Sequence, residues 1–385
     1  MKEKITAKSV FSNTPMELGI EDGKIISVQQ SNVAPDASLD YIAPGFFDIQ
    51  VNGYAGKDYT SALTPDEILH LVGQIAKSGT TQHVATVITN SEEQMIKSIK
   101  AIVEARKAHP MVEKGLVGIH VEGPFISAGQ GSRGVHDPRF IRPCDYEEFL
   151  RWQKAAEGLV RIVTISPEDE NALDFIRKVS ATGVIVGIGH TNAEPSLIAS
   201  AVEAGATLST HLGNGSAAML PRLENFLWKQ LSEDRLSASI IADGFHLPPY
   251  VLDSFTKAKG KERLILISDA AALAGSPPGV YRWGEMKIEV FEDGHMGLAG
   301  TSSLAGASLL LDTCVAHLCE VTAFSLADSV ACATANPHAL FGETTWTEVP
   351  RVGTEADFIL FSYREGERKL SVNRSVLGKY TLFQK

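Results

Sequence analysis

The sequence has few cysteines and no long hydrophobic run. Its 385 residues include four cysteines, Cys144, Cys314, Cys319 and Cys332, with no CxxC spacing, so we expect neither a disulfide framework nor a thiolate metal site. No apolar run approaches the roughly 20 residues that span a bilayer, and Met1 to Phe11 lacks the apolar core of a secretory signal. These features predict a cytoplasmic protein without a membrane partner.

Positive charge is also scarce relative to negative charge. Lysine and arginine number 35 against 46 aspartate and glutamate residues, which gives a formal net charge of -11. Proteins that bind nucleic acids usually carry a basic surface that displaces counterions from phosphates. We therefore expect no nucleic-acid partner, and an anionic substrate would need a local cluster of hydrogen-bond donors.

What the sequence does contain is a regular alternation of apolar runs and helical segments. Helical spacing is clear in Thr64 to Lys77, where Thr64 and Glu67 form a capping box, and in Ser91 to Lys107. The alternation predicts the α/β class and a (β/α)8 TIM-like barrel, with an open doubly wound sheet as the alternative. The eight expected strands are Gly45 to Val51, Thr81 to Val87, Leu116 to Val121, Val160 to Ile165, Val184 to Gly189, Thr207 to His211, Ser237 to Ala242 and Leu264 to Ser268.

The two ends of the chain differ from the middle. A turn at Glu21 to Lys24 predicts a β-hairpin near the N-terminus, and Ala356 to Phe361 and Ser371 to Phe383 read as further β-structure. Each end is too short to bury a core alone. We therefore expect residues 1–43 and 336–385 to form one small β-sandwich domain beside a barrel of residues 44–335.

Polar residues follow nearly every expected barrel strand. The C-terminal ends of the strands carry the chemistry of such barrels. Glu122, His190 and His211 form a set of one carboxylate and two histidines that suits a catalytic divalent metal with an open position for water. Zinc is the first expectation, with iron, cobalt and manganese as alternatives. The strand-end residues are Gln50, Asn52, His120, Glu122, His190, His211, Asp243, His246 and Asp269.

Several segments give the chain a resemblance to a known family. They are Pro44 to Gly53, His120 to Phe125, Gly189 to Ala193, Thr210 to Leu212, Ala242 to His246, Ser268 to Ala270, Leu298 to Thr301 and Ala335 to Pro337. In order and over nearly the whole chain, these segments resemble the N-acetylglucosamine-6-phosphate deacetylases of the amidohydrolase superfamily. The resemblance implies a distorted TIM barrel with a small β-sandwich from both termini, and a homodimer.

The resemblance also implies roles for individual residues. It implies that Glu122, His190 and His211 bind the metal, that Asp269 is the acid/base residue, and that His136 faces the acyl carbonyl of the substrate. The expected substrate is a small N-acetyl amino sugar phosphate, N-acetylglucosamine 6-phosphate. The residues that match the family's sugar and phosphate contacts are Asn214, Gly215, Arg222 and His246.

Two departures from the family pattern leave alternatives open. Many amidohydrolases carry a histidine pair where this chain has Gln50 and Asn52, and neutral amides are weak zinc ligands, so we expect one divalent ion per chain. The loop from residue 213 to 216 also departs from the family's usual sequence, which leaves room for another or an unphosphorylated N-acyl sugar. A non-catalytic barrel that binds a sugar or metal is a third reading, disfavoured because a binding protein does not need Asp269.

Overall fold

Eight parallel strands form the barrel. The computed structural model describes residues 2–33, 39–283, 286–301 and 304–385. In these residues each predicted barrel strand is confirmed, with shifted ends, and neighbours along the chain are neighbours in the sheet. The strands are β5 (Phe46–Val51), β8 (Thr80–Ile88), β9 (Leu116–Glu122), β10 (Val160–Ile165), β11 (Ile185–Ile188), β12 (Leu208–Ser209), β13 (Ser237–Ile240) and β14 (Leu264–Leu266).

The barrel closes through the residues that follow β14. The backbone N–H of Asp269 donates to the carbonyl oxygen of Gln50, at 3.0 Å. The buried carboxylate of Asp48 on β5 accepts the backbone N–H of Ser268 at 3.2 Å. Asp269 therefore lies on the seam of the barrel, at the C-terminal end of its strands.

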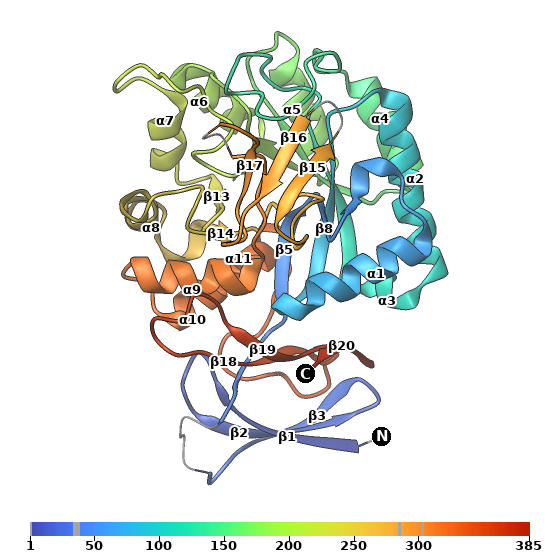
Figure 1. Ribbon diagram of the computed structural model, residues 1–385, viewed down its shortest axis with the longest axis vertical. Helices are drawn as coiled ribbons and strands as arrows, with labels where there is room; N and C mark the ends of the chain where they lie inside the picture. The colour runs from blue at the N-terminus through green and yellow to red at the C-terminus, as the bar shows by residue number, and fades with distance from the viewer. Residues whose placement is uncertain (1, 34–38, 284–285, 302–303) are drawn as a thin grey trace.

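Helices surround the barrel strands (Figure 1). Thr64 caps α1 through the predicted capping box with Glu67, and Ser91 caps α2. In the described part of the chain, no helix is both long and apolar enough to cross a bilayer. The helices are α1 (Pro65–Ile75), α2 (Glu92–Ala108), α3 (Pro110–Gly115), α4 (Tyr146–Ala155), α5 (Ala172–Ser180), α6 (Pro195–Ala204), α7 (Phe226–Ser232), α8 (Pro249–Arg263), α9 (Leu311–Val321), α10 (Leu326–Cys332) and α11 (Ala335–Leu340).

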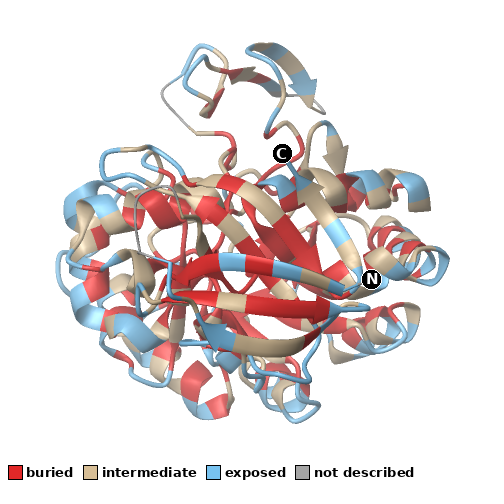
Figure 2. Cartoon of the chain, turned by 90° about the horizontal axis from the view of Figure 1, so that it is seen from below, coloured by how far each residue is buried: buried red, intermediate tan, exposed pale blue. Residues whose placement is uncertain are grey.

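Both termini contribute to one small β-domain, as predicted. Its seven strands form a continuous sheet in the order β20-β19-β18-β4-β1-β2-β3. The two halves of this sheet share a core that includes Leu18, Ile25 and Phe358, and buried residues run through its strands (Figure 2). The predicted hairpin turns at Asp22 and Gly23, both with positive φ. The strands are β1 (Lys2–Ser9), β2 (Pro15–Glu21), β3 (Lys24–Gln30), β4 (Tyr41–Ala43), β18 (Asp357–Ser362), β19 (Ser371–Leu377) and β20 (Tyr380–Gln384).

Two small sheets were not predicted from the sequence. An antiparallel sheet of β15 (Gly279–Trp283), β16 (Met286–Val290) and β17 (Met296–Leu298) follows the last barrel strand. A two-stranded sheet, β6 (Gly53–Tyr54) and β7 (Lys57–Asp58), follows β5. Both contribute side chains near the C-terminal ends of the barrel strands.

Candidate active site

Three predicted metal ligands meet at one point. Glu122 ends β9, and His190 and His211 lie two residues after β11 and β12. Oε1 of Glu122 lies 3.1 Å from Nε2 of His190 and 2.9 Å from Nε2 of His211, and the two histidine nitrogens are 3.0 Å apart. All three residues are buried. A carboxylate oxygen and two imidazole nitrogens at this spacing suit a small divalent cation.

The backbone at the site adopts conformations that are uncommon for residues with a side chain. His190, His211 and Asp269 have φ of 49°, 33° and 48°. Positive φ is uncommon for non-glycine residues, and such strain is concentrated at functional sites. In each case the left-handed residue lies two or three residues beyond the end of a barrel strand, where the chain turns at the rim.

Hydrogen bonds orient the ligand atoms. Nδ1 of His190 lies 2.8 Å from the carbonyl oxygen of Ser132, so the proton is on Nδ1 and the Nε2 lone pair faces the cavity. Gly215, at φ 56°, packs on this ring, and a Cβ there would lie 2.8 Å from Nδ1. Nε2 of Gln50 donates to Oε1 of Glu122 at 2.9 Å.

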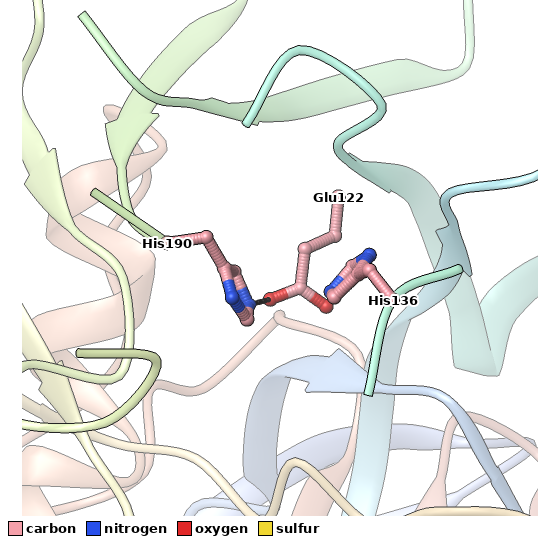
Figure 3. A group of neighbouring side chains, drawn as sticks. All are labelled: Glu122, His136 and His190. Carbon is pink, nitrogen blue, oxygen red and sulfur yellow. Dashed lines mark hydrogen bonds and ion pairs between the residues drawn. The ribbon is translucent and has the colours of Figure 1, made fainter. Parts of the chain in front are cut away.

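His136 lies on the other side of Glu122. Glu122, His136 and His190 offer ligand atoms within 4.8 Å of one another, and Figure 3 shows the Glu122 carboxylate between the two rings. Nδ1 of His136 is 2.7 Å from Oγ1 of Thr89. Burial lowers the pKa of His136 to about 3, with a further contribution from His190. The ring is therefore neutral at pH 7.

Asp269 lies in the same cavity. Its carboxylate is fully buried and accepts a hydrogen bond from Nδ2 of Asn52 at 2.7 Å. Burial, followed by the charge of Glu122, raises the pKa of Asp269 to about 6. A carboxylate with a raised pKa in a cavity is suited to accept and return a proton near neutral pH.

Every predicted site residue except Arg222 lines this cavity of about 230 Å³. Nδ2 of Asn214 is buried and has no partner among the described residues. Nδ1 of His246 pairs with Oδ2 of Asp243 at 2.7 Å. Arg222 is exposed and lies outside the cavity lining, so its contact with a phosphate stays a prediction.

Some residues at the site were missed from the sequence. The hydroxyl of Thr89 hydrogen-bonds His136, and the carbonyl oxygen of Ser132 hydrogen-bonds His190. Trp283 on β15 lines the cavity. Thr89 directly follows β8, so the rule that strand ends carry the chemistry would have found it. No comparable signal marks Ser132 or Trp283, because both lie in connections whose path depends on the folded barrel.

Comparisons with known proteins identify the family. No protein-family model matches the chain. It is 31% identical over 370 residues to the N-acetylglucosamine-6-phosphate deacetylase of Bacillus subtilis (strain 168), covering 93% of this chain and 91% of that protein. The chain belongs to the N-acetylglucosamine-6-phosphate deacetylase family.

The chain is also similar to a protein solved in complex with a sugar phosphate, and to a relative whose name contains a different sugar. A mutant N-acetyl-D-glucosamine-6-phosphate deacetylase from Mycobacterium smegmatis, in complex with N-acetyl-D-glucosamine-6-phosphate, superposes with a TM-score of 0.86 at 28% identity over 99% of both chains. The N-acetylgalactosamine-6-phosphate deacetylase of Shewanella sp. (strain ANA-3) is 30% identical over 318 residues, 83% of this chain and 78% of that protein. The family fold agrees with the barrel and terminal β-domain seen here.

Proposed function

We propose that this chain hydrolyses N-acetylglucosamine 6-phosphate to glucosamine 6-phosphate and acetate. The observation that carries the proposal is the convergence of Glu122, His190 and His211 in one buried cavity that also contains His136 and Asp269. The names of the relatives and the bound sugar phosphate in the Mycobacterium smegmatis protein support the choice of substrate.

One divalent cation per chain, with zinc as the expected metal, is part of this proposal. His211 fits the ligand set better than His136, because its Nε2 lies about 3 Å from both other ligand atoms. The side-chain amides of Gln50 and Asn52 donate hydrogen bonds to the carboxylates of Glu122 and Asp269. Because their N–H groups face the site, these two residues are placed as hydrogen-bond donors, and this supports a site without a second metal ion. A bound cation would polarise the acetamide carbonyl and lower the pKa of a water molecule.

The other residues of the cavity then have complementary roles. Asp269 accepts the proton of the attacking water and returns it to the departing nitrogen. Thr89 donates its hydroxyl hydrogen to Nδ1 of neutral His136, so the ring proton is on Nε2, where it is available to the carbonyl oxygen. A hydrogen bond to the developing oxyanion commonly contributes about 2.7 to 4 kcal/mol.

The sugar lies on the opposite side of the metal ligands from His136 in this proposal. Asn214, Gly215 and His246 line the cavity, and Nδ2 of Asn214, which has no partner among the described residues, is available to a sugar hydroxyl. The relative named for N-acetylgalactosamine 6-phosphate makes that epimer the second candidate substrate.

We also propose a cytoplasmic homodimer. Four large apolar side chains are exposed on the loop before α7, on α7 itself and at the start of α8, which is typical of an interaction surface. They are Met219, Leu223, Trp228 and Tyr250. The four cysteines are free, which supports a reducing compartment.

Product release from a panel of sugars tests the function. Acetate is measured with N-acetylglucosamine 6-phosphate, its galactose epimer and both unphosphorylated sugars, on protein of known metal content. We expect the highest kcat/KM with N-acetylglucosamine 6-phosphate. Preference for an unphosphorylated sugar would move the assignment to another N-acyl substrate, and metal binding without acetate release from any sugar would indicate a non-catalytic barrel.

A further inference from the structure

A large cleft adjoins the cavity that contains the metal ligands. Its volume is about 1060 Å³, several times that of the inner cavity. Most of the residues that line it have polar side chains, and they include Thr60, Asn90, Gln94, Arg133, Asp137 and Arg139. An acetyl group needs no such space, so the cleft is open to a larger part of a substrate.

The position of the cleft shows which end of the substrate it would receive. The inner cavity and the cleft share Asp58, Ile88, Val135, His136 and Trp283 in their linings. These shared residues lie at the boundary between the two spaces. The boundary includes His136, the residue that faces the acyl carbonyl in the proposed function.

None of the sugar-side residues reaches the cleft. Asn214, Gly215 and His246 line only the inner cavity. With the sugar on that side and the carbonyl at His136, the substituent on the carbonyl carbon points toward the cleft. Trp283 hydrogen-bonds the side chain of Asp58, so the boundary has a fixed wall at this point.

Arg133 gives the cleft a cation for an anionic group. In the described ranges Arg133 forms no ion pair, and its Nη1 reaches only the carbonyl oxygen of His136, at 3.4 Å. Arg139 differs, because its guanidinium binds both carboxylate oxygens of Asp137. The charge of Arg133 contributes to lowering the pKa of Asp137, after the hydrogen bonds from Arg139, but no carboxylate of the described residues lies within ion-pair distance of Arg133. A guanidinium in this position, beside the backbone of His136, suits a terminal carboxylate on the acyl chain.

We propose that the cleft is an acyl-side subsite and that the enzyme also hydrolyses N-acyl amino sugar phosphates whose acyl chain ends in a carboxylate, such as N-succinylglucosamine 6-phosphate. This inference rests on the proposed function. The amide C–N bond breaks and a C–O bond forms from water. The nitrogen takes a proton that originates from that water, and the products are succinate and the amino sugar phosphate.

Three substrates and two variants test the role of Arg133. The substrates are the N-acetyl, N-succinyl and N-succinamoyl derivatives of glucosamine 6-phosphate, the last being a neutral match to succinyl. We expect wild-type kcat/KM for the succinyl sugar to exceed that for the succinamoyl sugar at least about tenfold, as for a hydrogen bond to a charged group. Arg133→Gln should remove this preference. Arg151 is an exposed residue of α4 that lines neither space, so Arg151→Gln should keep the preference.

Binding distinguishes failure of this inference from failure of the proposed function. The dissociation constants of the succinyl and succinamoyl sugars are measured by calorimetry on the Asp269→Asn variant, with and without Arg133→Gln. A tenfold preference for succinyl that depends on Arg133 supports the subsite even if no sugar is hydrolysed. Equal constants, or hydrolysis of the acetyl sugar with no hydrolysis of the succinyl sugar, would overturn the subsite and leave the deacetylase function intact.

Discussion

Asp269 combines full burial with a hydrogen bond from Asn52. Its replacement by asparagine keeps the shape of the side chain but removes the ability to accept a proton. We expect Asp269→Asn to retain the fold and the bound metal and to lower kcat at least about a hundredfold, the scale of a lost general acid or base. Steady-state kinetics, circular dichroism and elemental analysis of the same preparation measure the three quantities.

The control for this variant is Asp253→Asn, which changes a half-buried carboxylate paired with Lys257 on α8, outside the cavity. It should have near-normal kcat. If Asp269→Asn also retained near-normal kcat with metal bound, Asp269 would be a structural residue and the proposed proton transfer would be wrong.

In the proposed mechanism, Thr89 fixes the tautomer of His136. Thr89→Val keeps the volume but removes the hydroxyl donor to Nδ1, so the ring proton is no longer held on Nε2. We expect kcat to fall about tenfold or more, with KM changed less, and Thr89→Ser to restore most of the loss. A loss that serine does not restore would indicate that the threonine methyl group packs the site and that the hydroxyl has no role in orienting His136.

Most single residues of the site could be predicted, because the end of each barrel strand is recognisable from its apolar run. Glu122, His190, His211 and Asp269 were found in this way. Their partners Thr89 and Ser132 were not, because a hydrogen bond between segments 47 or 58 residues apart depends on the relative position of loops. The positive φ of His190 and His211 could not be predicted from the sequence either, because it arises from the turn of the chain after each strand.

At the scale of elements, α7 and α8 are joined by a buried ammonium group. Nζ of Lys259 on α8 donates to the carbonyl oxygens of Gln230, Glu233 and Leu236, at 2.6, 2.8 and 3.0 Å. Gln230 lies in the last turn of α7 and Glu233 directly follows the helix. Carbonyl groups at this end receive no N–H from a further helical turn. Lys259 therefore caps α7 from a neighbouring helix.

We expect Lys259→Met to lower the free energy of unfolding by roughly 2 to 5 kcal/mol, because three buried carbonyl groups lose a charged donor. Thermal or urea denaturation measures the change. Lys257→Met, two residues away and exposed with a partner in Asp253, is the matched control and should change stability by less than about 0.5 kcal/mol. If Lys259→Met and Lys257→Met had equal stability, water molecules would be donating to the three carbonyl groups in place of the Lys259 ammonium group.

The strands that escaped prediction are short, with two to five residues each. All eight barrel strands were found because their apolar runs are bounded by glycine, proline and polar turns. The strand β15 alternates between intermediate and exposed residues, so it has no apolar face in the sequence. Its position near the site follows from the chain path after β14, which no local pattern encodes.

At the scale of the whole molecule, the metal content tests the proposed single metal site. We expect about one divalent ion per chain after purification without added metal, because Gln50 and Asn52 are engaged as hydrogen-bond donors. Chelation should abolish activity, and one equivalent of zinc should restore it. Two ions per chain at full activity would refute the single-metal proposal.

Replacement of Arg222 tests how the protein recognises the phosphate of the substrate. If Arg222 contacts the phosphate, binding energy from that remote group helps to position the acetamide. Arg222→Ala should then lose most of the preference in kcat/KM for N-acetylglucosamine 6-phosphate over N-acetylglucosamine, with metal content unchanged. Arg235→Ala removes another arginine, one paired with Glu203 and Glu233, and should keep the preference. An unchanged ratio in Arg222→Ala would assign phosphate recognition to other residues.

The shared terminal sheet has a consequence for synthesis on the ribosome. β4 pairs with both β1 and β18, and more than 300 residues separate β4 from β18 along the chain. The first four strands therefore emerge long before β18, and until then one edge of β4 has no partner. Because an open edge can pair with other chains, the nascent barrel or a chaperone must shield it, and premature termination before β18 should yield aggregation-prone fragments.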